Sequence, residues 1–235
     1  MVHTEERLAL DDGAQTTLER WGERGPVMLA VHGMTGSRKA WEPFAEHYGK
    51  QARVYAYDQR GHGDSDVGGP MSLHRSLLDL HNVIAALPDE VDTVIGHSWG
   101  GAIAILGGRR FDVRRVVAID PMIRQSGNAM YNAFLREVKK QKLLSTAIKR
   151  LRDENPPRTW DLRGDLERYP KPLFLAVGEG PESLVALEDL KYIQERGGAN
   201  VALRVFEGHG HNLHRTDFER FSRALDTFLE RTEAS

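Results

Sequence analysis

A serine between two glycines is the feature of this sequence with the clearest chemical potential. Residues 94–101 read Val-Ile-Gly-His-Ser-Trp-Gly-Gly, an apolar run followed by a segment suited to a tight turn. Ser98 stands at its centre, between Gly96 and Gly100. A sharp turn from a strand into a helix brings the positions two before and two after its apex together, and a side chain at either one would hinder that approach. The pattern indicates a serine hydroxyl held clear of the backbone, which becomes a nucleophile where a base accepts its proton.

Polar clusters follow other apolar runs of the chain in the same way. Such clusters begin at residues 32, 58, 120 and 207, and they contain histidine, aspartate and glycine. Because the carboxyl ends of parallel strands meet at one edge of a sheet, we expect these clusters to gather around Ser98. A histidine on another strand end can then serve as the base for the serine.

The elements that must position these residues alternate between short apolar runs and amphipathic segments. This is the pattern of a parallel sheet with helices on both faces. Residues 5–10 and 14–21 flank an Asp-Asp-Gly turn, which predicts a hairpin and an antiparallel start to the sheet. We expect eight strands, near residues 5–10, 14–21, 27–31, 54–57, 92–95, 116–119, 173–177 and 201–206.

One long segment interrupts this alternation. Residues 121–171 separate two successive strands, contain helical patterns and include Pro156 and Pro157. About fifty residues is too long for a plain crossover connection. We therefore predict a small helical cap at 121–171, inserted in a core formed by residues 1–120 and 172–235.

With these motifs in this order, the sequence resembles the α/β-hydrolase superfamily over nearly the whole chain outside the predicted cap. The motifs are His-Gly-Met-Thr-Gly-Ser at 32–37, Asp-Gln-Arg-Gly-His-Gly-Asp-Ser at 58–65, Gly-His-Ser-Trp-Gly-Gly at 96–101 and Gly-His-Gly-His at 208–211. The resemblance implies an α/β-hydrolase fold: a mostly parallel eight-stranded sheet with helices on both faces and a cap. It also implies a serine hydrolase of the esterase type.

The resemblance gives Ser98 the role of nucleophile and His211, in the loop after the last strand, the role of its base. Because the chain has ten histidines, the choice of His211 as the base rests on the position that the base occupies in the family. By the same analogy four neighbouring histidines are structural or line the pocket, namely His62, His97, His209 and His214.

The resemblance also supplies an oxyanion hole. Its donors are the backbone N–H groups of Met34 and Trp99, aimed at the tetrahedral intermediate. Trp99, His32 and Gly33 are expected to line the substrate site.

The third member of the triad is missing from its usual place. Many relatives carry it in a Gly-x-x-Asp motif after the penultimate strand, but residues 178–183 read Gly-Glu-Gly-Pro-Glu-Ser, with Pro181 at the aspartate position. Proline cannot orient an imidazole. Asp120, at the end of the strand that follows the Ser98 helix, is the preferred acid, and Glu182 is the alternative.

Composition excludes several classes of function. The chain has no cysteine, which removes disulfides, thiolate catalysis and cysteine zinc sites. A net charge of −2 over 235 residues gives no indication of nucleic-acid or membrane binding. No apolar run is long enough to span a membrane and the N-terminal residues are too charged for a signal peptide, so we expect a cytoplasmic protein.

Two charged clusters have both a functional and a structural interpretation. Asp58, Asp64 and Asp66 could suggest a metal site, but the intervening Arg60 favours a turn-stabilising role. Residues 136–152 hold seven Lys or Arg and one Glu, which could attract an anionic substrate but is more typical of a solvated helix face.

The sequence thus predicts a serine hydrolase that cleaves carboxylic esters of short to medium acyl groups through an acyl-enzyme. Its partner is a small-molecule ester, and neither a cofactor nor a metal is expected. The alternatives are an acyl-CoA thioesterase, a carbon–carbon bond hydrolase, and a hydrolase-like ligand-binding receptor with little turnover. Oligomeric state cannot be predicted from the sequence.

Overall fold

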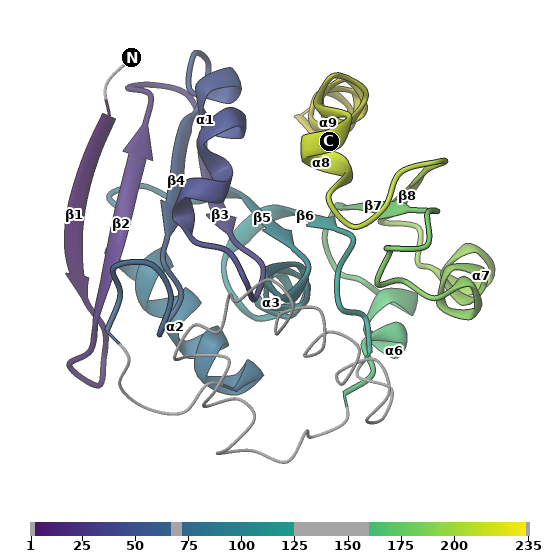
Figure 1. Cartoon of the computed structure of the whole chain (residues 1–235), viewed down its shortest axis with the longest axis horizontal. Coiled ribbons are helices and arrows are strands. Elements are labelled where there is room, and N and C mark those ends of the chain that lie inside the picture. Colours follow the sequence, from purple (N-terminus) through teal and green to yellow (C-terminus); the bar gives the residue numbers. More distant parts are fainter. Residues whose placement is uncertain (1–2, 67–71, 125–159, 234–235) are drawn as a thin grey trace.

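One eight-stranded sheet organises the molecule (Figure 1). The computed structural model describes residues 3–66, 72–124 and 160–233. The strands are β1 (His3–Ala9), β2 (Gln15–Trp21), β3 (Val27–Val31), β4 (Arg53–Tyr57), β5 (Val91–His97), β6 (Val113–Ile119), β7 (Leu173–Gly178) and β8 (Val201–Phe206). Their order in the sheet is β1-β2-β4-β3-β5-β6-β7-β8. The expected eight strands are confirmed.

Only β2 runs against its neighbours. It pairs antiparallel with both β1 and β4, and every other strand pair is parallel. The residues of β3 and β7 are all buried, as strands covered on both faces require. The carboxyl ends of β3 to β8 therefore open on one edge of the sheet.

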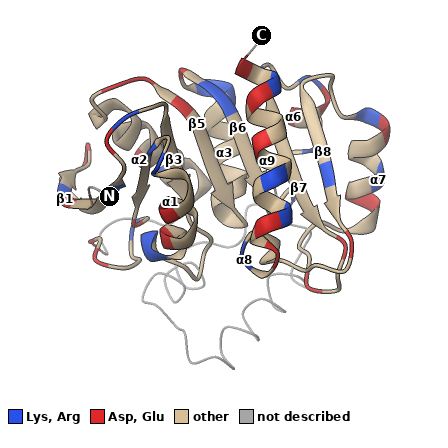
Figure 2. Ribbon diagram, turned by 90° about the horizontal axis from the view of Figure 1, so that it is seen from above, with Lys and Arg blue, Asp and Glu red and all other residues tan. Residues whose placement is uncertain are grey.

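Helices cover the two faces of the sheet (Figures 1 and 2). On one face lie η1 (Arg38–Trp41), α1 (Glu42–Tyr48), α8 (Leu213–Thr216) and α9 (Phe218–Glu233). On the other lie α2 (Leu73–Ala86), α3 (Trp99–Arg110), α6 (Arg163–Glu167) and α7 (Leu187–Arg196). None of the helices in the described ranges is both long and apolar enough to cross a bilayer.

Amphipathic spacing explains how these helices attach. In α9 Phe221, Leu225 and Phe228 are buried, and they recur at the helical period on the face turned toward the sheet. At the start of α2 the Ser72 hydroxyl accepts a hydrogen bond from Arg75 N at 3.1 Å, a standard N-cap.

The predicted cap is described only at its two ends. A β-bridge joins Arg124 to Asp161, and Leu162 N donates to Ile123 O at 2.8 Å. Leu166 and Tyr169 pack into the core cluster beneath the sheet. The rest of the predicted cap, 125–159, lies outside the described residues, and so does the basic run at 136–152.

Candidate active site

Ser98 occupies a strained turn between β5 and α3. Its backbone has φ 59° and ψ −118°, a left-handed conformation that is costly for a residue with a side chain. A Cβ at Gly96 would lie 2.0 Å from Gly100 O, and one at Gly100 would lie 2.2 Å from Val31 O. Both positions therefore need glycine: Gly96 because the turn brings Gly100 close to it, as predicted, and Gly100 because β3 lies against the turn.

The neighbouring strand end also comes close to the serine. A Cβ at Gly33, after β3, would lie 3.1 Å from Ser98 Cβ. Gly33 thus lets the loop after β3 run beside the Ser98 side chain. Among the described residues no hydrogen bond joins the Ser98 hydroxyl to a partner.

The structure brings His211 and Asp120 together from different strand ends. His211 lies in the loop between β8 and α8, and its Nδ1 is 2.7 Å from Asp120 Oδ2. Asp120 follows β6, is fully buried and has φ 39°. Because an ionised carboxylate only accepts, the shared proton belongs to Nδ1, which leaves Nε2 of the neutral ring free to accept a proton.

Asp120 is held by three further donors. Gly178 N at 3.2 Å and Ser183 Oγ at 2.6 Å donate to Oδ1, and Leu184 N at 2.8 Å donates to Oδ2. All three belong to β7 or to the segment that follows it, where many relatives would place the acid itself. This segment therefore supplies donors to a carboxylate on the adjacent strand.

Glu182 has a different environment. It is exposed, and no hydrogen bond or ion pair joins it to another described residue. Its side chain packs instead against Gly210, where an added Cβ would lie 2.9 Å from Glu182 Cβ. Of the two carboxylates considered from the sequence, the structure places Asp120 against His211.

Two further histidines lie in a row with His211. His97, which precedes Ser98, donates from Nε2 to His211 O at 2.9 Å, and the two ring centroids are 4.4 Å apart. The ring of His214 contacts that of His97, with centroids 4.5 Å apart. Burial, followed by the charge of His211, lowers the pKa of His97 to about 3, and burial also holds the pKa of His214 well below its usual value. Both rings therefore stay uncharged near neutral pH.

The backbone N–H groups of Met34 and Trp99 are available to a ligand. Trp99 is the first residue of α3, where an N–H group has no partner within the helix. Neither N–H donates a hydrogen bond to any residue within the described ranges. Trp99 follows Ser98 directly in the chain. Met34 follows Gly33, whose backbone lies beside the Ser98 side chain.

Side chains behind the loop fix Met34 in place. His62 Nε2 lies 2.5 Å from Met34 O. Gln59 N donates to His32 Nε2 at 2.9 Å, which identifies Nε2 as the unprotonated nitrogen, and His32 Nδ1 donates to Gly33 O at 2.7 Å. Burial lowers the pKa of His32 to about 3. With both nitrogens engaged, the His32 ring holds the loop and does not present a nitrogen to substrate.

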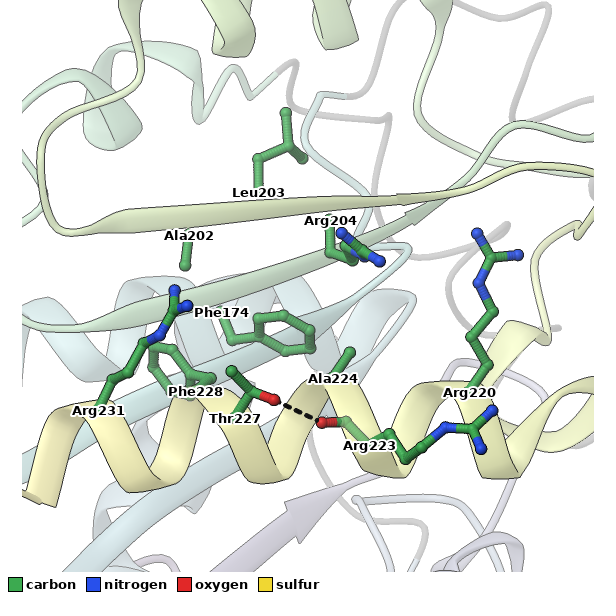
Figure 3. A pocket seen from close by; sticks show the side chains of 10 residues that line it. All are labelled: Phe174, Ala202, Leu203, Arg204, Arg220, Arg223, Ala224, Thr227, Phe228 and Arg231. Atoms are coloured by element: carbon green, nitrogen blue, oxygen red, sulfur yellow. Dashed lines mark hydrogen bonds between the residues drawn. The ribbon is translucent and has the colours of Figure 1, made fainter.

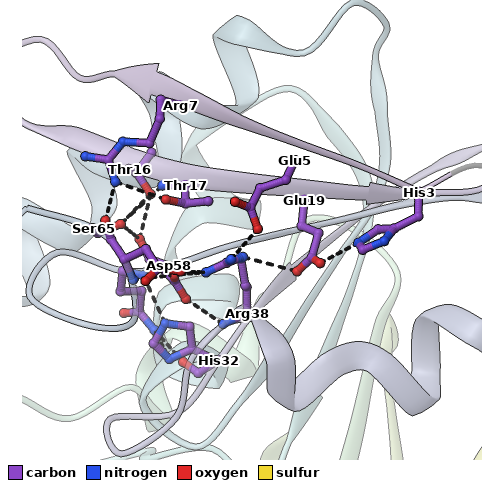
Figure 4. Close-up of polar contacts among 12 residues, drawn as sticks. His3, Glu5, Arg7, Thr16, Thr17, Glu19, His32, Arg38, Asp58 and Ser65 are labelled. Carbon is purple, nitrogen blue, oxygen red and sulfur yellow. Dashed lines mark hydrogen bonds and ion pairs between the residues drawn. The ribbon is translucent and has the colours of Figure 1, made fainter.

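Arg38 joins the same loop to neighbouring carboxylates (Figure 4). Its guanidinium is 2% exposed and forms ion pairs with Asp58, with Asp64 at 2.8 Å, with Glu19 at 3.1 Å and with Glu5. Asp58 also accepts from Arg38 N at 2.7 Å and from Asp64 N at 2.9 Å. These contacts tie the N-terminal hairpin to the loops after β3 and β4.

The aspartates at 58–66 are thus used for structure. Asp66 accepts from Gln15 N at 2.8 Å and pairs with Arg7. Within the described residues, no group of three or more His, Asp or Glu side chains could hold a metal ion. The turn-stabilising interpretation of these carboxylates is confirmed.

Sequence reasoning missed several residues around the site. Ser183 orients Asp120, and Arg38 anchors the Met34 loop. Trp160 packs its ring on Trp99, with centroids 5.4 Å apart at 71°, and donates from Nε1 to Met122 O at 3.1 Å. The only signal for Ser183 was its place in the segment that lacked the expected aspartate. Trp160 and Arg38 carried none, because their contacts join parts of the chain that are distant in sequence.

Comparison with known proteins agrees with this architecture. The alpha/beta hydrolase family profile matches residues 28–224. The chain is 30% identical over 114 residues to lipase LipV of Mycobacterium tuberculosis, covering 47% of this chain and 43% of the lipase. It is 32% identical over 145 residues to protein phosphatase methylesterase 1 of Homo sapiens, covering 54% of this chain and 36% of that protein. The matched segments span less than half the length of these two relatives.

Solved structures show the same fold. A hydrolase from Pseudomonas aeruginosa PA01 superposes with a TM-score of 0.80 at 19% identity, covering 96% of this chain and 98% of that one. Carboxylesterase CesB from Bacillus subtilis gives 0.79 at 19% identity, covering 97% and 92%. Together with the family profile over residues 28–224, the sheet order and the turn at Ser98 show that this chain belongs to the alpha/beta hydrolase family.

Proposed function

We propose that this protein is a serine hydrolase that cleaves carboxylic esters of short to medium acyl groups through an acyl-enzyme. The observation that carries the proposal is the 2.7 Å contact between His211 Nδ1 and Asp120 Oδ2, beside the strained turn at Ser98. That contact orients the ring so that Nε2 can accept the serine proton.

In the proposed mechanism, Ser98 Oγ attacks the ester carbonyl carbon as its proton passes to His211 Nε2. The carbonyl oxygen becomes an oxyanion that accepts hydrogen bonds from Met34 N and Trp99 N. The acyl C–O bond then breaks, and the leaving alcohol takes the proton from His211. Water repeats the sequence on the acyl-enzyme, releasing the carboxylic acid and restoring the serine.

The electrostatics around His211 support this role. The ring becomes an imidazolium during each half-reaction, and buried Asp120 stabilises that charge. His97 and His214 would oppose it if they were protonated, but the burial that lowers their pKa values keeps them neutral. Neither ring therefore adds a positive charge beside the imidazolium.

The relatives and the insertion support the choice of substrate. The two sequence relatives are a lipase and a methylesterase by name, and one solved structure is a carboxylesterase. The limit on acyl size rests on the short insertion at 121–171. A thioester or a carbon–carbon bond could be cleaved by the same residues, and no contact among the described residues favours either over an ester.

Labelling by a fluorophosphonate probe tests the nucleophile. The wild-type protein should be labelled and Ser98→Ala should not, while Ser72→Ala, which alters a serine at the cap of α2, should be labelled like the wild type. An unlabelled wild-type protein would contradict the proposal.

A substrate panel tests the acyl group. The rates of hydrolysis of p-nitrophenyl esters of increasing chain length should be highest for short to medium chains and should exceed those for acyl-CoA. A highest rate on long-chain esters would overturn the size limit, and a highest rate on acyl-CoA would replace the ester by a thioester.

A further inference from the structure

A groove lies at the outer edge of the sheet, between α9 and the strands β7 and β8 (Figure 3). Its volume is about 640 Å³, within the range of small-molecule sites. Phe174 and Ala202, each the second residue of its strand, form part of the wall. Ser98 and His211, in contrast, follow the carboxyl ends of their strands. The groove is therefore separate from the candidate active site.

The charged residues that line this groove are all basic. They are Arg204 on β8 and Arg220, Arg223 and Arg231 on α9, and no Asp or Glu is among the lining residues. The chain as a whole has a net charge of −2, so this concentration of arginine is local. Figure 3 shows Arg231 toward one end of the groove and Arg204 and Arg220 toward the other.

Two of these arginines lack a carboxylate partner among the described residues. Arg223 is paired with Glu219 at 2.7 Å. Arg220 instead lies over the ring of Phe206, with 5.3 Å from its Cζ to the ring centroid. The Arg204 side chain is exposed and makes no hydrogen bond or ion pair within the described part of the chain.

The geometry of β8 brings Arg204 and Arg220 together. Side chains alternate along a strand, so Arg204 and Phe206 project from the same face of β8, about 7 Å apart. The guanidinium of Arg220 over Phe206 is thus adjacent to Arg204. Two adjacent cations without carboxylates match a group that carries two negative charges and several acceptor oxygens.

Apart from the arginines and Thr227, the residues that line the groove are apolar. Ala202 on β8 and Ala224 on α9 both line the groove, and their small side chains leave room between the strand and the helix. Phe174 and Phe228 are buried beneath them, 4% and 7% exposed. An occupant can therefore place a hydrocarbon segment against the floor while its anionic group meets the arginines.

We propose that this groove binds a phosphate monoester with a short hydrocarbon group. The phosphate accepts hydrogen bonds from Arg204 and Arg220, and the hydrocarbon lies along Ala202 and Ala224. The site is independent of the hydrolytic reaction, since none of its residues contacts Ser98, Asp120 or His211.

Calorimetric titration with hexyl phosphate at low ionic strength tests this proposal. The full chain should bind one equivalent, and Ser98→Ala should bind equally well. Arg204→Gln and Arg220→Gln should each raise Kd about tenfold or more, since each removes hydrogen bonds from a charged donor. Arg24→Gln, which alters an exposed arginine beyond β2 and outside the groove, is the matched control and should leave Kd unchanged.

Two further probes separate the contributions of charge and hydrocarbon. Inorganic phosphate should bind more weakly than hexyl phosphate, and hexanol should not bind. Ala224→Trp, which fills the floor, should remove the advantage of hexyl phosphate over phosphate. Equal affinity for phosphate and hexyl phosphate in the wild-type protein would overturn the role of the floor.

Other outcomes would overturn the site itself. These are no binding up to about 5 mM hexyl phosphate, equal weakening in Arg24→Gln, or binding that is blocked when the protein is labelled at Ser98. A dimer in sedimentation that Arg204→Gln dissociates would show that this face binds a second copy of the chain.

Discussion

Replacing Asp120 by asparagine tests the proposed triad most directly, because the side chain keeps its shape and loses its charge. The two carboxylate oxygens accept four hydrogen bonds, from Gly178 N, Ser183 Oγ, Leu184 N and His211 Nδ1, at 2.6–3.2 Å. An amide NH₂ cannot accept, so one of the two oxygen positions must lose its bonds.

The rotamer that places NH₂ at Oδ1 costs less. Ser183 can rotate and accept from the amide, which leaves only Gly178 N–H unsatisfied, at about 1–3 kcal/mol. The ring of His211 then keeps its contact but loses the negative charge that stabilises the imidazolium. Two unit charges about 4 Å apart at an effective dielectric constant of about 20 attract by about 4 kcal/mol. This corresponds to a loss in kcat of about 10³-fold.

The opposite rotamer costs more. NH₂ at Oδ2 faces Leu184 N–H and His211, and the ring can respond only by moving its proton to Nε2. That tautomer cannot act as the base, and the loss then approaches about 10⁴-fold. We therefore expect kcat of Asp120→Asn to fall about 10³- to 10⁴-fold.

Steady-state hydrolysis of a p-nitrophenyl ester measures this effect, and circular dichroism establishes that the variant is folded. Glu182→Gln is the matched control and should retain nearly wild-type kcat, since no hydrogen bond joins Glu182 to another described residue. An Asp120→Asn enzyme within about tenfold of the wild type, or an equal loss in Glu182→Gln, would refute the reasoning.

Three further predictions concern the surroundings of the site. His32 and His97, with folded pKa values of about 3 against 6.5 when unfolded, bind fewer protons in the folded state, so stability should fall as pH drops below 6.5. At pH 4.5 the free energy of unfolding should be lower by about 5 kcal/mol for the pair, as measured by urea unfolding. His97→Gln removes one of the two groups, so an equally large decrease in that variant would contradict the prediction. His97→Leu, which removes the donor to His211 O, should lower kcat about tenfold, whereas His97→Gln retains an N–H donor and should lower it less; equal losses would exclude the hydrogen bond as the cause. Gly100→Ala should lower the free energy of unfolding by about 2 kcal/mol or more, because its Cβ would overlap Val31 O; Gly164→Ala, whose Cβ meets nothing within 4 Å, is the control, and equal melting temperatures would contradict the overlap.

The strands were predictable because each buried parallel strand is an apolar run that ends in polar residues. The helices α6, α7 and α8 were not predicted. In α7 only Leu190 and Ile193 among the apolar residues are buried, and charged residues at 188, 189, 191, 195 and 196 obscure the helical period. Such short, polar helices form because the chain must connect parallel strands, which a local pattern does not reveal.

The sequence by itself determined the turn at Ser98, since the need for glycine at 96 is a local steric requirement, whereas glycine at 100 is needed because β3 lies against the turn. It also determined the order in which polar segments follow the strands. Only the tertiary structure decided which carboxylate meets His211. Asp120 and Glu182 both precede His211 in the chain and both follow a strand, so neither order nor spacing separates them. The difference arises from the parallel register of β6, β7 and β8, which places Asp120 beside the loop after β8 and directs Gly178 N, Ser183 Oγ and Leu184 N onto its carboxylate.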